Sequence, residues 1–167
     1  MRTGRILALA VGIALFAAAC SSAASTSKPA AGPTTTTVSA QRVAGVGTIY
    51  TDANGMALYT PAQETNGKVE CTGSCTSIWI PLTAPANGSP TKAAGVQGNL
   101  GVIDRPDGTS QVTLDGAPLY RFVQDTQAHT VNGNGISDSF NGINFTWHVE
   151  SGGRVMTTTG SGSGYGY

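Results

Sequence analysis

Three cysteines give this chain its widest range of possible chemistry. Cys71 and Cys75 are separated by three residues, so a bond between their sulfurs would close a very tight ring. The chain-entropy model assigns so small a ring only about 2 kcal/mol of stabilisation. We therefore expect a structural disulfide that shapes a turn and delivers Trp79 and Leu82 into the core.

Free thiols at the same positions would support a different chemistry. Cys71 and Cys75, with His129 or His148, would offer the soft sulfur and imidazole ligands that suit copper. A C-x-x-x-C spacing with a distant histidine resembles membrane-anchored copper chaperones of respiratory oxidases. Those proteins have a thioredoxin-like α/β fold, whereas no βαβ pattern is visible here, and His148 should lie exposed on the face opposite Trp147. Copper handling or thiol redox chemistry is therefore the alternative to a disulfide.

A second constellation combines aromatic rings with a carboxylate. Tyr120 and Phe122 are two residues apart and share one face of a strand, and Asp125 follows near its end. The set could form a binding edge, or both rings could pack in the core while Asp125 accepts backbone N–H bonds at a turn. We favour core packing. No G-x-S-x-G elbow, H-E-x-x-H motif or phosphate loop is present, so we expect no enzyme, and a hydrolase is the weakest alternative.

These residues belong to a segment that occurs twice. Asp115-Gly116 separates two alternating runs, and this dipeptide accepts the positive φ angles of tight hairpin turns. An earlier segment, Gly55-Met56-Ala57-Leu58-Tyr59, aligns with Gly116-Ala117-Pro118-Leu119-Tyr120, and Glu64 follows Tyr59 at the distance that separates Asp125 from Tyr120. We infer two related hairpin repeats, at about residues 46–82 and 100–149.

Frequent turns between short β-prone runs predict a mainly β fold. We expect a small antiparallel sandwich or partly closed barrel over residues 45–157, with at most short helical turns. Residues 100–123 should form a three-stranded meander and residues 133–142 a turn-rich connection. The final strand, 143–149, directs Ile143, Phe145, Trp147 and Val149 to one face. The two halves are expected to meet around Trp79 and Trp147.

The N-terminus has the features of an export signal. Arg2 and Arg5 precede an apolar run over residues 6–19, which is shorter than the roughly 20 residues that span a membrane. The run ends in small residues before Cys20, similar to a bacterial lipobox. We expect a signal peptide over residues 1–19 and a Cys20 that carries fatty-acyl chains such as palmitate, which leaves the other two cysteines as a pair. The alternative is an ordinary signal peptide beside a chance cysteine.

Flexible segments are expected on both sides of the folded part. Residues 20–44 are rich in Ser, Ala, Thr and Pro and predict an extended stalk, and residues 158–167 predict a Gly/Ser/Tyr tail. The chain carries nine basic and nine acidic residues, without the basic stripe typical of nucleic-acid binding. We expect a monomer without cofactor that contacts membrane lipid through Cys20, with an envelope protein or small ligand as its partner.

The pattern formed by Tyr120, Phe122 and Asp125 matches Y-x-(F/W/Y)-x-x-D. It resembles the predicted bacterial lipoproteins named for that motif, also called the secreted repeat of unknown function. In the first copy, Pro61 replaces the aromatic residue and Glu64 replaces the aspartate. Ile80 stands where the family usually has a proline, and His129 lies where Pro-Gly-Asp is usual. The resemblance implies an exported domain, lipid-anchored on the extracytoplasmic face of the bacterial cell membrane, and brings no established catalytic residues.

Overall fold

The computed structural model describes residues 37–86 and 88–152. This part of the chain is mainly β, with three antiparallel sheets and no closed barrel, and it fits the predicted small β sandwich. Its elements are β1 (Ser39–Val43), β2 (Gly47–Thr51), β3 (Tyr59–Pro61), α1 (Cys75–Ile78), β4 (Trp79–Pro81), β5 (Leu100–Asp104), β6 (Ser110–Leu114), β7 (Ala117–Pro118), β8 (Tyr120–Phe122), β9 (Ser137–Phe140) and β10 (Ile143–Val149).

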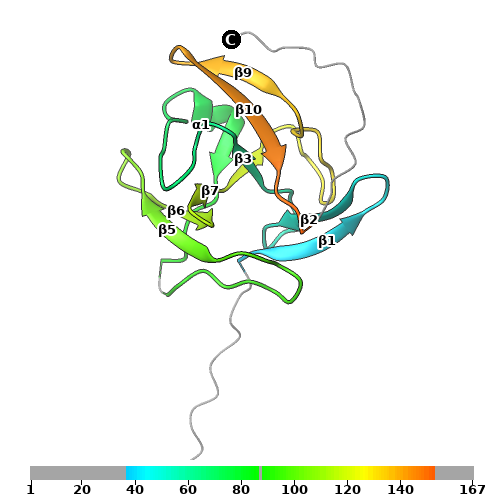
Figure 1. The fold of residues 1–167 in the computed structure, drawn as a ribbon. Helices are drawn as coiled ribbons and strands as arrows, with labels where there is room; N and C mark the ends of the chain where they lie inside the picture. Colours follow the sequence, from blue (N-terminus) through cyan, green and yellow to red (C-terminus); the bar gives the residue numbers. More distant parts are fainter. Residues whose placement is uncertain (1–36, 87, 153–167) are drawn as a thin grey trace, which may run out of the picture. The chain divides into compact units, whose positions relative to one another are not determined.

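The largest sheet has five strands in the order β4-β8-β3-β10-β9. Figure 1 labels three of them, β3, β10 and β9. Strands β1 and β2 form a two-stranded sheet, and β5, β6 and β7 form a three-stranded sheet. Strands β6 and β7 are joined by Asp115 at φ 49° and Gly116 at φ 85°. The predicted Asp-Gly hairpin turn is therefore confirmed, because two consecutive positive φ angles are the mark of this turn type.

The same strand arrangement occurs once in each half of the described chain. At the centre of the five-stranded sheet, Tyr59 lies directly opposite Tyr120. On one side β4 pairs Trp79 with Phe122, and on the other side β10 pairs Trp147 with Pro61. Phe122 and Pro61 each lie two residues after a central tyrosine. Trp79 and Trp147 therefore occupy equivalent positions around an approximate two-fold axis.

Backbone hydrogen bonds follow the same approximate symmetry. In each half, three backbone N–H groups donate in turn to one another's carbonyls, which links three chain segments in a triangle. In the first half these bonds, 2.7 to 2.9 Å long, join Tyr50, Leu58 and Glu150. In the second half bonds of 2.8 to 3.0 Å join Val112, Leu119 and Leu82. Each triangle thus includes a residue from the other half. Glu150, directly after β10, completes the first triangle, and Leu82, directly after β4, completes the second.

The folded region begins earlier than predicted. The stalk was expected to continue to residue 44, but Ser39–Val43 form β1, which pairs with β2 in the register Ser39↔Thr51. Val38 is fully buried, which anchors the start of this strand. The prediction is wrong at this boundary because the largely polar segment Ser-Ala-Gln-Arg-Val pairs with β2 although it buries little apolar surface.

Two further expectations are wrong in the second repeat. The meander ends at β7, and β8 joins the five-stranded sheet instead, next to β3 and β4. The connection over residues 133–142 contains β9, which pairs with β10 through Asn144↔Ser139. Its burial alternates, with Asp138 and Phe140 inside and the two serines outside. Because one of the two inward-facing residues is an aspartate, the alternation of hydrophobic and polar residues does not reveal this strand.

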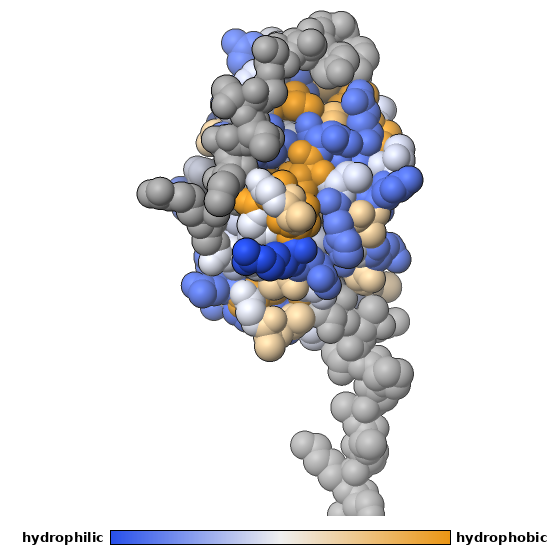
Figure 2. Space-filling view, turned by 90° about the vertical axis from the view of Figure 1, so that its right-hand side faces the viewer, coloured by the Kyte–Doolittle hydropathy of each residue, from blue (hydrophilic) through white to orange (hydrophobic). Residues whose placement is uncertain are grey.

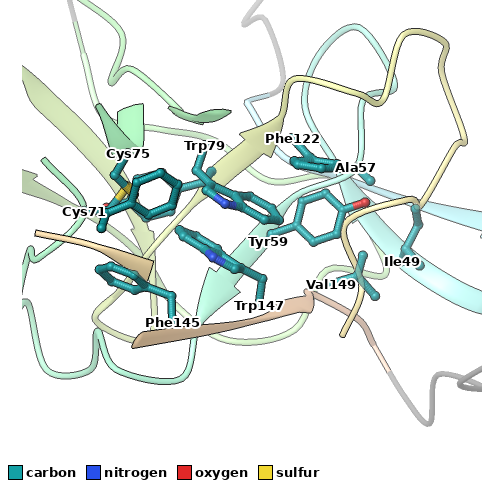
Figure 3. Packing of buried hydrophobic residues seen from close by; sticks show 12 residues of the cluster. Ile49, Ala57, Tyr59, Cys71, Cys75, Trp79, Phe122, Phe145, Trp147 and Val149 are labelled. Atoms are coloured by element: carbon teal, nitrogen blue, oxygen red, sulfur yellow. A yellow bond between two sulfur atoms is a disulfide. The ribbon is translucent and has the colours of Figure 1, made fainter. Parts of the chain in front are cut away.

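A column of aromatic rings fills the main core (Figure 3). Trp79 and Trp147 are fully buried and stack with ring centroids 3.9 Å apart and planes 9° apart. Both indole N–H groups donate to Asp138, at 2.7 Å from Trp79 and 2.9 Å from Trp147. The predicted alternation of the last strand is confirmed for Phe145, Trp147 and Val149, which are buried, whereas Ile143 is partly exposed.

Gly133 provides a test of this packing. A Cβ atom at Gly133 would lie 2.9 Å from a ring carbon of Trp79 and 2.9 Å from one of Tyr59. Because both rings are held by neighbours, Gly133→Ala should lower the free energy of unfolding by about 1–3 kcal/mol. Gly152→Ala is the matched control, since its Cβ would come no closer than 3.3 Å to the Tyr50 hydroxyl. Equal stability of the two variants in urea denaturation would contradict the packing described.

Candidate functional site

All five residues of the two motif copies lie inside the domain. Tyr59, Tyr120 and Glu64 are 0% exposed, and Phe122 and Asp125 are 3% exposed. The rings of Tyr59 and Phe122 make an edge contact, and Tyr120 makes another with Trp147. This placement matches the favoured interpretation, in which the motif packs in the core. The described residues of the motif form no exposed aromatic edge.

Each motif tyrosine donates a hydrogen bond to the carboxylate of the other repeat, and this crossed pairing is the exchange of carboxylates between the repeats. The Tyr59 hydroxyl donates to Oδ2 of Asp125 at 2.6 Å, and the Tyr120 hydroxyl donates to Oε2 of Glu64 at 2.7 Å. Each carboxylate follows one tyrosine by five residues in sequence but binds the other one. The spacing within Y-x-(F/W/Y)-x-x-D therefore does not reflect a contact inside one motif. The spacing places each carboxylate within hydrogen-bond distance of the tyrosine hydroxyl of the opposite repeat.

Each carboxylate also fixes a loop with its second oxygen. Oδ1 of Asp125 accepts the backbone N–H of Asn132 at 2.9 Å. Oε1 of Glu64 accepts the backbone N–H groups of Glu70 at 2.6 Å and Cys71 at 2.5 Å. The expectation that Asp125 accepts backbone N–H bonds is thus correct. Its partner, however, lies at the far end of a loop rather than in the adjacent turn.

Arg105 supplies a buried positive charge near one of these pairs. Its side chain is 0% exposed, and its guanidinium donates to the Cys71 carbonyl at 2.7 Å, to Gln111 Oε1 at 2.5 Å and to the Tyr120 hydroxyl at 3.2 Å. Tyr120 therefore lies between a buried cation and the Glu64 carboxylate. The ion-pair partner of Arg105 is Asp107, 3.2 Å from Nε, whose side chain is about half exposed.

Burial controls the ionisation of the paired groups. Desolvation, followed by the charge of Asp125, raises the pKa of Tyr59, and desolvation, followed by the charge of Glu64, raises the pKa of Tyr120. Both phenols thus remain protonated donors at neutral pH. Desolvation also raises the pKa of Asp125, and the hydrogen bond from Tyr59 is the largest influence that lowers it.

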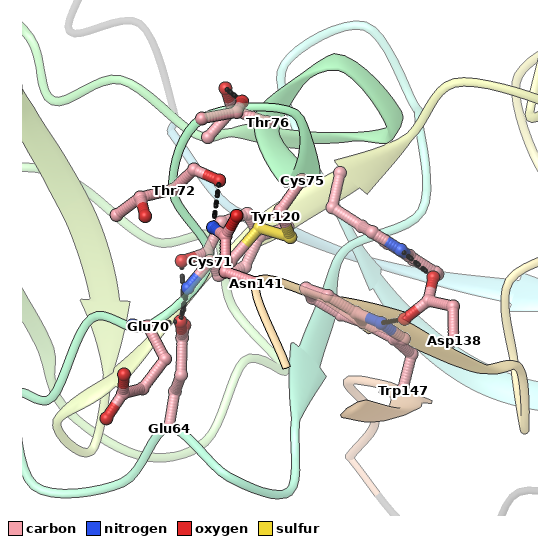
Figure 4. The surroundings of a disulfide bond; sticks show 12 residues. Glu64, Glu70, Cys71, Thr72, Cys75, Thr76, Tyr120, Asp138, Asn141 and Trp147 are labelled. Atoms are coloured by element: carbon pink, nitrogen blue, oxygen red, sulfur yellow. Dashed lines mark hydrogen bonds between the residues drawn. A yellow bond between two sulfur atoms is a disulfide. The ribbon is translucent and has the colours of Figure 1, made fainter. Parts of the chain in front are cut away.

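Cys71 and Cys75 form the predicted disulfide, with Cα atoms 5.3 Å apart (Figure 4). Both residues are fully buried. Cys75 begins the short helix α1, and Trp79 follows directly as its C-terminal cap and as the first residue of β4. The disulfide therefore orients the segment that carries Trp79 into the main core. Leu82 packs, partly buried, against a second cluster around Leu119 and Val112.

The copper hypothesis is not supported by this geometry. The sulfurs of Cys71 and Cys75 are bonded to each other and cannot act as thiolate ligands. His148 is exposed, as expected from the strand alternation, and His129 is exposed in a loop. Within residues 37–86 and 88–152, no group of three or more His, Cys, Asp or Glu side chains is arranged to hold a metal ion. Cys20 lies outside the described residues.

Two important residues were missed in the sequence. Arg105 lies in Asp104-Arg105-Pro106-Asp107-Gly108, which has the composition of a solvent-exposed turn. Asp138 lies between two serines in a segment expected to be irregular. The alternation around Asp138 was the available signal, because Phe140 marks the inward face. No sequence signal distinguishes Arg105 from a surface arginine.

The role of Arg105 can be tested by truncation. Arg105→Ala would leave the Gln111 Oε1 atom and the Cys71 carbonyl without their buried donor, so the free energy of unfolding should fall by about 3 kcal/mol. Arg42→Ala removes an exposed arginine from β1 and should change stability by about 0.5 kcal/mol or less. Chemical denaturation of both variants measures the difference. A loss below about 1 kcal/mol for Arg105→Ala would contradict its role as the buried donor to these acceptors.

Asp125 predicts a pH dependence of stability. Because its pKa is raised on folding, the folded state holds the proton more tightly, and this stabilisation is lost as pH rises above the ordinary value of 3.8. Asp125→Asn should therefore remove a downward slope of stability with rising pH. Asp107→Asn is the opposite control, since hydrogen bonds from Thr109 lower the Asp107 pKa to about 2 and that contribution is lost as pH falls. Urea titrations between about pH 3 and about pH 8 compare them, and an unchanged slope in Asp125→Asn would contradict the assignment.

Comparison with known proteins identifies one similarity. The family model described as "Secreted repeat of unknown function" matches residues 101–149. The match covers β5 through β10 and includes the motif at Tyr120, Phe122 and Asp125. No curated protein and no solved structure matches the chain. The second repeat is thus similar to a family of secreted repeats whose activity is undetermined, which suggests that the protein is exported.

Proposed function

We propose that this protein is a lipid-anchored, non-enzymatic module of the bacterial cell envelope, which binds or spaces another envelope component. The observation that carries this proposal is the exchange of carboxylates between Tyr59 and Tyr120. The motif residues join the two repeats by hydrogen bonds that cross between them. This geometry supports a structural role for the motif, because its tyrosines and carboxylates bond to one another inside the domain.

The buried chemistry of the motif argues against hydrolysis. The carboxylates of Glu64 and Asp125 each accept a phenol proton and backbone N–H groups, so their lone pairs are used within the fold. A general base must reach a substrate proton within about 2.6–3.2 Å, directly or through one water. Groups with an exposed fraction of 3% or less do not offer that access.

The proposed location of the protein at the membrane surface is supported by its sequence and by the family match. The apolar run before Cys20 and the small residues beside it fit a lipobox, and the match to secreted repeats agrees with export. Two acyl chains anchor a protein stably, whereas one gives marginal, reversible binding. In the part of the chain that the structure describes, no helix has the length and apolarity needed to cross a membrane.

The surface offers room for a partner. Hydrophobic residues gather in the middle of the face shown in Figure 2, between hydrophilic ones. Among the described residues, Val102 of β5 is 49% exposed and Val123, just after β8, is 41% exposed. A monomeric module of this kind would contact an envelope protein or small ligand through such mixed surfaces.

Substitution at Cys20 tests the anchor. Cys20→Ser should move the protein from the membrane fraction to the soluble fraction and abolish the mass increase due to acylation. The matched control, Cys71→Ser with Cys75→Ser, removes both other sulfurs and should leave the protein on the membrane. Fractionation and intact-mass measurement report both results. An unacylated wild-type protein, or a Cys20→Ser variant that stays on the membrane, would contradict the proposal.

A further inference from the structure

The most oxidisable rings of the described domain form one continuous series of contacts. Ring centroids are 5.5 Å apart for Tyr59 and Trp79, 3.9 Å for Trp79 and Trp147, and 5.2 Å for Trp147 and Tyr120. Figure 3 shows Tyr59, Trp79 and Trp147 in this series. The chain has two tryptophans and five tyrosines, so both tryptophans and two of the tyrosines belong to it.

Every polar hydrogen in this series is bonded to a carboxylate. Tyr59 donates to Asp125, and Tyr120 donates to Glu64. The two tryptophans donate to the two oxygens of Asp138, as Figure 4 shows for Trp147. The three carboxylates are themselves buried, with exposed fractions of 9% or less. Four oxidisable rings therefore have three buried carboxylates as hydrogen-bond acceptors.

This arrangement has a specific chemical consequence. Loss of one electron from a phenol makes its O–H strongly acidic, so oxidation needs a proton acceptor already in place. Proton transfer requires a base within about 2.6–3.2 Å, and both phenols satisfy this distance. Burial raises the pKa of Asp125, which favours the protonated carboxyl group after transfer. Rings in contact also allow an electron vacancy to move from one to the next.

Packing alone does not require these acceptors. Tyr50 is 2% exposed and lies in the second cluster, where its hydroxyl accepts the backbone N–H of Gln97 at 2.9 Å. A buried tyrosine of this fold can therefore be accommodated with a neutral partner. Burying carboxylates is costly by comparison. The chain nevertheless places a carboxylate beside each ring of the series, whereas the Tyr50 hydroxyl bonds to a backbone amide.

We propose that Tyr59, Trp79, Trp147 and Tyr120 form a path that accepts an oxidising equivalent from a one-electron, metal-centred oxidant and stores it as a tyrosyl radical. The oxidant takes one electron from an indole and is reduced. An electron then moves from Tyr59 or Tyr120 to that indole, the phenol O–H bond breaks, and the proton goes to Asp125 or Glu64. Return of one electron to the phenoxyl oxygen, with the same proton, restores the starting state.

The test uses the full chain with Tyr165→Phe and Tyr167→Phe, which removes the two tyrosines outside the described residues. Only Tyr50, Tyr59 and Tyr120 then remain. Flash-generated ruthenium(III) polypyridyl serves as the oxidant, and electron paramagnetic resonance and transient absorption detect the radicals. We expect a hydrogen-bonded tyrosyl signal that persists in Tyr50→Phe and is lost in the Tyr59→Phe, Tyr120→Phe double variant, which retains only tryptophanyl radical.

A second measurement needs no substitution in the core. After the same oxidation of the unaltered chain, peptide mapping by mass spectrometry should find oxidation products at Tyr59, Tyr120 and the tryptophans several-fold above those at Tyr50. This measurement decides the question if the double variant does not fold. Absence of a radical, a tyrosyl signal lost with Tyr50→Phe alone, or equal modification of Tyr50 would overturn the inference. The inference does not depend on the lipid anchor.

Discussion

The exchange of carboxylates between two tyrosines is the interaction on which the rest of this fold depends. Tyr59 lies opposite Tyr120 at the centre of the largest sheet, yet each hydroxyl is satisfied by the carboxylate of the other repeat. A carboxylate without partners in such a core would be strongly unfavourable. One oxygen of each carboxylate is satisfied by backbone N–H groups of its own half, and the other oxygen accepts from the opposite tyrosine. The two repeats are therefore held together by these crossed hydrogen bonds as well as by hydrophobic packing.

The neighbouring interactions extend this constraint. Asp138 joins Trp79 of the first repeat to Trp147 of the second, and Arg105 joins the Tyr120 hydroxyl to the loop that carries Cys71. Buried networks of this type are specific because every member must find its partner. The disulfide acts locally within the same network, since Glu64 holds the N–H of Cys71 and Arg105 holds its carbonyl. A repeated motif used in this way gives the domain a defined shape.

Much of the fold could be predicted from turn chemistry and alternation. Asp115-Gly116 specifies its hairpin locally, and the last strand alternates apolar and polar residues, so both were predicted correctly. The cysteine spacing also indicated the disulfide. Strand β1 was missed because polar β-prone residues resemble a stalk. The exchanged pairs could not be predicted, since sequence spacing suggests that Asp125 serves its own motif, whereas the two-fold arrangement assigns it to Tyr59.

Double-mutant cycles on unfolding free energy test the exchange most directly. The account predicts coupling of about 1–3 kcal/mol for Tyr59→Phe with Asp125→Asn and for Tyr120→Phe with Glu64→Gln, the pairs that cross between repeats. The pairs within one motif copy, Tyr59 with Glu64 and Tyr120 with Asp125, should show coupling of about 0.5 kcal/mol or less. Stronger coupling within each copy than across the repeats would contradict the account.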